Sequence, residues 1–148
     1  MPGSKSYIWI HAIWSTKYRE PLILPAIERE LKKSMREQFL KMGCIVGIIN
    51  GTRDHVHCLF SLSRVQTVAE IIRNVKGGSA FHINRMNCME DKFKWQDGYA
   101  AYSVSKSHFN KVFNYIKHQK RHHRVGDVLE DYENDDFMML SPLGEIEE

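Results

Sequence analysis

The sequence lacks long hydrophobic runs and has little cysteine. No stretch approaches the roughly 20 consecutive apolar residues of a transmembrane helix, and the first residues lack the pattern of a signal peptide. Cys44, Cys58 and Cys88 are scattered, without the Cys-x-x-Cys spacing typical of structural zinc sites, and their odd number argues against a disulfide framework. We therefore expect a reduced, cytoplasmic protein without a membrane segment.

Basic residues are absent from the end of the chain. Residues 126–148 contain no Lys or Arg and nine Asp or Glu, whereas residues 1–125 hold all 21 Lys and Arg against nine acidic residues. The length of 148 residues and the 43% hydrophobic content predict one globular domain over residues 1–125, followed by an acidic tail with a short helix or only solvated chain. The excess of basic residues in this domain favours a polyanionic partner such as nucleic acid. The alternative is a basic surface that serves only solubility.

The apolar residues follow strand and helix periodicities in turn. They predict strands at 7–16, 44–49, 54–60 and 99–105 and helices at 25–42, 67–86 and 108–122, with Gly43 ending the first helix and Ser107 capping the last. The first six elements have the βαββαβ order of a ferredoxin-like or RRM-like α+β fold. In that fold an antiparallel sheet carries its helices on one face, and here a C-terminal helix is added.

Two glycine-containing segments have specific predictions. Asn50-Gly51 predicts a tight hairpin turn before the strand at 54–60, because both residues tolerate positive φ. Gly77-Gly78 disfavours helix and predicts a break or a close backbone approach within the second helix. Lys76 and Ser79 flank these glycines and would hold a phosphate in such a break; a plain kink is the alternative.

The strand at 54–60 contains a pair of histidines. Residues two apart in a strand point to the same face, so His55 and His57 project side by side while Val56 and Cys58 point to the core. Two neighbouring imidazoles are half of a divalent metal site of the kind that assists phosphate chemistry. Two surface histidines on an edge strand have the same pattern, so the pair alone does not decide between these alternatives.

The last helix supplies the groups that would complete such a site. Tyr115 and Gln119 are four residues apart and therefore share one helix face. A tyrosine hydroxyl, with a pKa near 10, needs nearby positive charge to act as a nucleophile, and a metal on the histidines would supply it. Gln119 offers a carbonyl oxygen as third ligand, and attack by Tyr115 on phosphorus would give a phosphotyrosine ester. A helix-surface tyrosine and a solvated glutamine are the alternatives.

Four segments together resemble a known family. In order along the chain, they are Asp54-His55-Val56-His57, Val75-Lys76-Gly77-Gly78-Ser79, Gly98-Tyr99-Ala100-Ala101-Tyr102-Ser103-Val104-Ser105 and Tyr115-Ile116-Lys117-His118-Gln119. Over roughly residues 5–125 the chain resembles the single-tyrosine HUH transposases of the simplest insertion sequences and the related REP-associated tyrosine transposases.

The resemblance implies a DNA transposase that cleaves and rejoins single-stranded DNA at element ends, often at imperfect hairpins. By position, Tyr115 matches the nucleophile that forms a 5′-phosphotyrosine, and His55, His57 and Gln119 match the ligands of Mg²⁺ or Mn²⁺. Two imidazoles and a carbonyl suit Mn²⁺ or Zn²⁺ better than Mg²⁺, so ligand type does not decide the metal. Family members form homodimers, often with the tyrosine of one subunit serving the histidines of the other.

Further residues are candidates for supporting roles. Asp54 is a candidate to orient a histidine by a hydrogen bond, although it also suits the turn. Candidate DNA contacts are Arg53, Lys76, Ser79, Arg85, Trp95, Lys106 and Arg121. Trp95 would stack on a base, and packing within the hairpin is its alternative.

We expect a metal-dependent tyrosine transposase acting on single-stranded DNA. Two other functions remain compatible with the sequence. A domesticated relative would bind hairpin nucleic acid without forming a covalent adduct, and a metal-dependent hydrolase would cleave phosphodiesters with water and without Tyr115.

Overall fold

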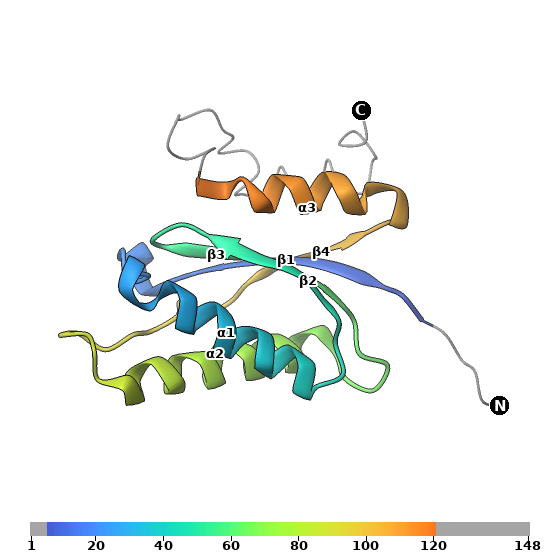
Figure 1. The fold of residues 1–148 in the computed structure, drawn as a ribbon. Helices are drawn as coiled ribbons and strands as arrows, with labels where there is room; N and C mark the ends of the chain where they lie inside the picture. The colour runs from blue at the N-terminus through green and yellow to red at the C-terminus, as the bar shows by residue number, and fades with distance from the viewer. Residues whose placement is uncertain (1–5, 121–148) are drawn as a thin grey trace.

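The computed structural model describes residues 6–120, which form a four-stranded sheet between two helical layers (Figure 1). The strands are β1 (Trp9–Ser15), β2 (Val46–Gly51), β3 (His55–Ser61) and β4 (Ala100–Val104), in the spatial order β2-β3-β1-β4 with every neighbouring pair antiparallel. Helices α1 (Pro25–Lys41) and α2 (Val68–Met86) lie on one face, and α3 (Phe109–Lys117) lies on the other. This arrangement confirms the predicted ferredoxin-like α+β fold with an added C-terminal helix.

The larger core lies between the sheet and the pair α1 and α2. The apolar stripe of α1 includes Leu31, Met35 and Phe39, all at most 1% exposed, and Phe39 packs on Phe60 of β3 with ring centroids 4.6 Å apart. Gly43 ends α1 at a φ of +84°, as its position after the apolar stripe predicts. β1 is the central strand, hydrogen-bonded on both sides, which explains its apolar composition.

Helix α2 begins as predicted but does not break at its glycines. The capping box is present, with the Thr67 hydroxyl accepting from the Glu70 backbone N–H and the Glu70 carboxylate accepting from that of Thr67. The helix continues through Gly77 and Gly78 to Met86, so the predicted break is wrong. At Gly78 the alternative of a close approach is right: a Cβ there would lie 2.5 Å from the Gln38 side chain of α1.

The hairpin before β3 turns later than predicted. Asn50 and Gly51 belong to β2, where they pair with His57 and Val56, and the chain turns at residues 52–54. Gly51 is required for space, since a Cβ there would lie 2.1 Å from the backbone oxygen of His55. The prediction of a turn at Asn50-Gly51 is therefore wrong, because a close backbone approach also selects glycine.

A smaller apolar cluster joins α3 to the opposite face of the sheet. Its buried members are Leu59 of β3, Val104 of β4, and Val112 and Ile116 of α3. The helix starts after a short 3-10 turn, η2 (Lys106–His108), so its N-cap is His108 and not Ser107 as predicted. Helix α3 itself ends at Lys117, residues 119–120 are again helical after a turn at His118, and residues 121–122 of the predicted helix lie outside the described residues.

Two further predictions can be compared with only part of the chain. Within residues 6–120, no helix is long and apolar enough to cross a membrane. The acidic segment 126–148 and Arg121 lie outside the described residues.

Candidate functional site between β3 and α3

His55 and His57 project from β3 toward the layer that contains α3. Their neighbours Val56 and Cys58 are at most 3% exposed and belong to the core on the other side, as strand alternation predicts. The two imidazole centroids are 5.2 Å apart, and the residues are 2% and 0% exposed. The pair is therefore buried beneath the α3 layer and is not an exposed surface pair.

Polar groups of the hairpin turn hold His55. Its Nδ1 lies 2.7 Å from Oδ1 of Asp54 and 3.0 Å from the hydroxyl of Thr52. Asp54 in turn accepts from Arg19 at 3.3 Å. The hydrogen bond from His55 lowers the pKa of the Asp54 carboxyl, and the charge of Arg19 adds to this effect against the opposing effect of burial. Asp54 thus makes the contact predicted for a residue that orients a histidine.

A third histidine holds His57. Nε2 of His11, on β1, lies 2.9 Å from Nδ1 of His57, and the two rings are stacked with centroids 5.1 Å apart. His11 is fully buried. With Nδ1 hydrogen-bonded in both His55 and His57, Nε2 is the atom through which each ring would coordinate a metal.

Helix α3 brings Tyr115 to the histidine pair. The Tyr115 ring packs edge-on against His57, with ring centroids 5.7 Å apart and an interplanar angle of 79°. Val112 and Ile116, on the same helix, are buried against the sheet and set the orientation of this face. The histidines and the tyrosine, separated by about 60 residues in the sequence, thus lie in one site within a single chain.

The end of α3 is docked on the hairpin by Asn50 and Lys120. The Asn50 amide donates to the carbonyls of Ile116 and Lys117 at 3.0 and 3.1 Å. These carbonyls are among the last of the helix, which lack intrahelical partners, and Asn50 supplies a hydrogen-bond donor to both. Lys120 donates to Asn50 Oδ1 at 2.9 Å and to the carbonyl of Gly51 at 3.0 Å. Since Asn50 pairs with His57 across the sheet, the helix end is held beside the histidine strand.

Gln119 lies just beyond α3 and is fully buried. Neither its amide nitrogen nor its amide oxygen has a hydrogen-bond partner among the residues that the structure describes. A buried amide without partners is costly, so such a group calls for an explanation. An oxygen ligand to a cation is one, and the predicted alternative of a solvated glutamine does not agree with this burial.

The residues present fit a divalent metal through two imidazoles and one amide oxygen. Within residues 6–120, no group of three or more His, Cys, Asp or Glu side chains is arranged to hold a metal, so this site would depend on Gln119 as its third ligand. Both histidines have a hydrogen-bonded Nδ1, which is typical of metal-ligating imidazoles. The set is nitrogen-rich and suits Mn²⁺ or Zn²⁺ better than Mg²⁺.

The predicted DNA contacts do not form one surface. Ser79 is fully buried, and its hydroxyl accepts from the Trp95 indole, which is itself 8% exposed and packs edge-on against Trp14. This geometry favours packing of Trp95 within the protein over stacking on a base. Ser79 has no exposed atom with which to contact DNA. Arg85 is exposed on α2, on the face of the sheet opposite α3, with its guanidinium near the ring of Phe81.

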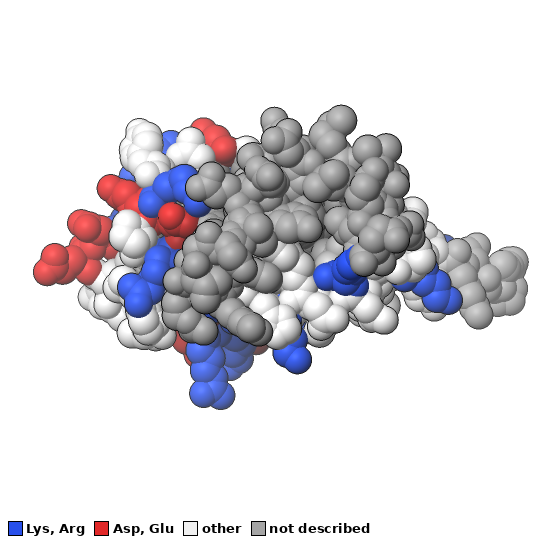
Figure 2. Space-filling model, turned by 90° about the horizontal axis from the view of Figure 1, so that it is seen from above, with Lys and Arg blue, Asp and Glu red and all other residues white. Residues whose placement is uncertain are grey.

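The other predicted contacts are cations in different places. Arg53 is exposed in the hairpin turn next to Asp54, and Lys106 is exposed in η2, before α3. Lys76 is engaged with backbone carbonyls near β4. Figure 2, which views the molecule from the α3 side, shows Lys and Arg side chains at several places along the rim and acidic side chains toward one end.

Three of the residues that build the site are not predicted from the sequence. His11, Asn50 and Arg19 act through contacts with residues distant in the sequence. Only His11 had a local signal, since it is a polar residue in an otherwise apolar central strand.

The profile of the IS200-like transposases (Y1_Tnp) matches residues 4–119, which is most of the chain. The chain belongs to this transposase family. A curated relative, the ISDra2 transposase TnpA of Deinococcus radiodurans, is 26% identical over 130 residues, covering 80% of this chain and 91% of the relative.

Two solved transposase structures have a similar fold. A crystal structure from Deinococcus radiodurans, assigned as a transposase, superposes with a TM-score of 0.64 at 22% identity and covers 80% of this chain and 95% of its own. A REP-associated tyrosine transposase bound to a REP hairpin superposes with a TM-score of 0.57 at 12% identity, covering 80% of this chain and 71% of its own. These similarities confirm the α+β fold and agree with the family.

Proposed function

We propose that this IS200-like transposase cleaves and rejoins single-stranded DNA through a covalent bond between Tyr115 and a 5′-phosphate. The observation that carries the proposal is the contact between the Tyr115 ring and His57, because it joins a nucleophile to a buried histidine pair. We infer the covalent step and the metal from the chemistry of these side chains.

In the proposed reaction, the Tyr115 hydroxyl loses its proton and its oxygen attacks the scissile phosphorus. A bond forms between phosphorus and the tyrosine oxygen, and the bond to the 3′-oxygen breaks, so that oxygen leaves and takes up a proton. Rejoining is the reverse reaction with a new 3′-hydroxyl and needs no ATP, since the phosphodiester energy is kept in the tyrosine ester.

The remaining residues would hold the reacting groups. His55 and His57 would bind a divalent cation through Nε2, and Gln119 would add its amide oxygen. When bound, the cation supplies positive charge to a non-bridging phosphate oxygen and to the tyrosine oxygen. Asp54 and His11 hold the two imidazoles in orientation, and Asn50 holds the end of α3.

The DNA partner is proposed on two grounds. The basic composition of residues 1–125 favours a polyanion, and a structural neighbour is bound to a REP hairpin. Association into a homodimer and a cytoplasmic location stay predictions.

The test is an adduct assay on a denaturing gel. Labelled single-stranded DNA from the flanks of the gene is incubated with the protein and Mn²⁺ or Mg²⁺, beside Tyr115→Phe and an EDTA control. Tyr7→Phe is a matched control, because Tyr7 is exposed and precedes β1. We expect a protein-linked DNA band with the parent and Tyr7→Phe that is absent from Tyr115→Phe and from the EDTA sample.

Other outcomes would contradict the proposal in distinct ways. Cleavage without a linked band that persists in Tyr115→Phe would indicate a hydrolase that uses water. Binding without cleavage, on DNA known to contain the element ends, would indicate a domesticated binding protein.

A further inference from the structure

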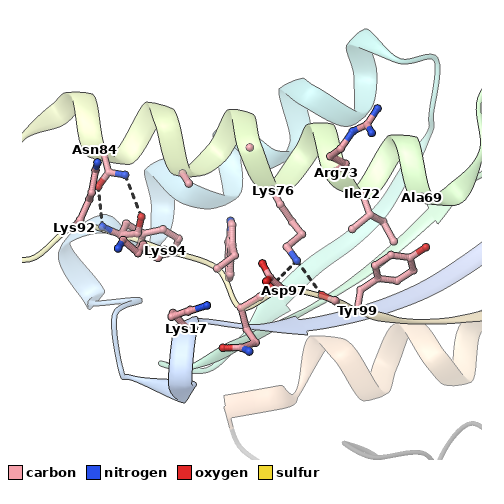
Figure 3. Close-up of a pocket in the computed structure, with 16 residues that line it drawn as sticks. Lys17, Ala69, Ile72, Arg73, Lys76, Asn84, Lys92, Lys94, Asp97 and Tyr99 are labelled. Atoms are coloured by element: carbon pink, nitrogen blue, oxygen red, sulfur yellow. Dashed lines mark hydrogen bonds between the residues drawn. The ribbon is translucent and has the colours of Figure 1, made fainter.

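A basic cavity of about 720 Å³ lies between α2 and the segment 92–99 that leads into β4 (Figure 3). Five cationic side chains line it, against one carboxylate, Asp97; they are Lys17, Arg73, Lys76, Lys92 and Lys94. The cavity lies on the α2 side of the sheet and does not include the histidine pair. Its charge favours an anionic ligand, and its volume is that of a small-molecule site.

Lys76 connects the two sides of this cavity, α2 and the segment 92–99, by hydrogen bonds. Its ammonium group donates to the carbonyls of Gln96 at 2.7 Å and of Gly98 at 2.9 Å, across the opening between α2 and the segment 92–99. Burial lowers the pKa of Lys76, partly offset by the charge of Asp97. A cation held against neutral carbonyls in a half-buried position gains from an added anionic group nearby.

On the α2 side of the cavity, Gly77 leaves the helix backbone without a side chain to cover it. A Cβ at this position would meet no atom within 4 Å, in contrast to Gly78, where Gln38 fills the space. Glycine disfavours the interior of a helix, and at Gly77 the described structure offers no packing reason for it. An open helix surface within a basic cavity allows the backbone or sugar of a ligand to approach closely.

Apolar and aromatic groups stand at one side of the cavity. Figure 3 shows the ring of Tyr99 near Ile72 and Ala69, and Tyr99 is 44% exposed. Partly exposed aromatic rings beside lysines are typical of surfaces on which unpaired bases stack. The cavity therefore combines charge for a phosphate with a ring for a base.

The cavity is close to the histidine strand through the end of β1. The backbone N–H of Gln96 donates to the carbonyl of Ser15 at 2.9 Å, and Ser15 is the sheet partner of His55. The N–H of Thr16 donates to the carbonyl of Asp54 at 2.9 Å. The cavity wall and the strand that carries the histidine pair are thus linked by directly hydrogen-bonded backbone at this end of the sheet.

We propose that this cavity binds an unpaired nucleotide of the single strand that flanks the scissile phosphate. Lys94 and its basic neighbours would bind the phosphate, Tyr99 would stack on the base, and Gly77 would leave room for the sugar. This inference rests on the proposed function and adds to it a second DNA contact, away from Tyr115, that selects the strand to be cut.

The test separates cavity filling from loss of stability. Gly77→Leu places a good helix former where a Cβ would meet no atom within 4 Å, so the urea midpoint should stay equal or rise while the side chain extends into the cavity. Lys94→Glu reverses a charge in the cavity, and Lys33→Glu reverses one on the exposed surface of α1 as the matched control. Affinity for labelled single-stranded DNA from the gene's flanks is measured by fluorescence anisotropy, with every variant also carrying Tyr115→Phe.

We expect Gly77→Leu and Lys94→Glu to weaken binding about tenfold, the size typical of one stacked base, and clearly more than Lys33→Glu does. In addition, 5-iodouracil placed within a few nucleotides of the scissile phosphate should photocrosslink to the peptide that contains Tyr99. Affinities of both cavity variants equal to that of Lys33→Glu would overturn the proposal.

The adduct assay distinguishes this failure from failure of the proposed function. If the parent forms a Tyr115 adduct and the cavity variants bind DNA with unchanged affinity, the proposed nucleotide site is wrong and the proposed transferase activity is supported. If the cavity variants lose affinity and the parent forms no adduct, the nucleotide site is supported and the covalent mechanism is wrong. The absence of any single-stranded DNA binding by the parent would overturn both.

Discussion

Nε2 of His11 lies 2.9 Å from Nδ1 of His57, although the two residues are on different strands and 46 positions apart. One hydrogen between these nitrogens makes one ring the donor and the other the acceptor. Coordination of a metal through Nε2 of His57 requires His57 Nδ1 to be the donor, so His11 would then accept. His11 thereby sets both the orientation and the tautomer of its neighbour.

We expect His11→Leu to weaken Mn²⁺ binding by about 10–100-fold, the usual effect of removing a partner of a metal-ligating histidine. His11→Gln is the matched variant, because its amide oxygen can reach the place of the imidazole Nε2 and accept from His57. Titration of free Mn²⁺ by electron paramagnetic resonance measures the affinity without DNA. Equal affinities for the parent and His11→Leu would show that His11 only fills space.

Tyr115 and the histidine pair lie together within one chain in this structure. Tyr115 contacts His57 of its own chain, and α3 is held on its own sheet by the apolar cluster and by Asn50. We therefore expect that mixing His57→Ala with Tyr115→Phe gives no more adduct than either variant alone. Partial recovery, with subunit exchange demonstrated by mass spectrometry, would show that the tyrosine serves a neighbouring subunit.

Asn50 links the end of α3 to β2. Asn50→Ala would leave the carbonyls of Ile116 and Lys117 and the ammonium of Lys120 with fewer partners, so we expect a loss of about 1–3 kcal/mol in unfolding free energy. Urea denaturation measures this loss, with Asn110→Ala, an exposed position on α3, as the control. Hydrogen exchange should accelerate most in α3, and uniform acceleration over all elements would contradict this local role.

The ammonium group of Lys120 also donates to the carboxylate of Glu28 on α1, and this ion pair predicts a pH dependence of stability. Burial alone would raise the pKa of the Glu28 carboxyl, but hydrogen bonds and charge from Lys120 and Lys32 outweigh it and lower the pKa below its usual 4.5. The carboxylate is thus favoured in the folded state. Its stabilisation is present above pH 4.5 and is lost as the pH falls through the lower folded pKa.

We expect Glu28→Gln to lower the unfolding free energy at pH 7 by about 0.5–1 kcal/mol, typical of a partly exposed ion pair. The difference from the parent should shrink as the pH is lowered below 4.5, as measured by urea denaturation at several pH values. Glu37→Gln, at an exposed position of the same helix, is the control. A difference that does not depend on pH would contradict the ionic origin.

The sequence predicts local features of this fold well. The alternation of sheet faces around His57, the apolar stripe of α1 and the capping box at Thr67 each depend on neighbours in the chain, and the structure confirms all three. The order of these elements then limits the topology to a few antiparallel arrangements.

Features that depend on distant contacts could not be predicted in the same way. Gly51 is needed because the backbone of His55 passes close to it. In the sequence, a glycine required for this reason cannot be distinguished from a glycine required by a turn. Helix α2 continues through Gly77 and Gly78 because buried side chains on both sides of them, including Ile72 and Ile83, hold it against the sheet. His11 and Asn50 join the site only through strand order and the docking of α3.

Gln119 allows a test in which stability and metal affinity change in opposite directions. Its buried amide has no hydrogen-bond partner within residues 6–120, so in metal-free protein the amide is a destabilising group. Gln119→Leu replaces it with an apolar side chain of similar size. We expect the unfolding free energy in EDTA to rise by about 1–2 kcal/mol.

The same change should remove a metal ligand. Saturating Mn²⁺ stabilises a protein that binds it only when folded, so the urea midpoint of the parent should rise on adding Mn²⁺ and that of Gln119→Leu should rise much less. Ile116→Leu, a buried change on α3 that keeps the amide, is the control. If Gln119→Leu were destabilised in EDTA and kept the full response to Mn²⁺, Gln119 would be a structural residue, and the metal would need a different third ligand.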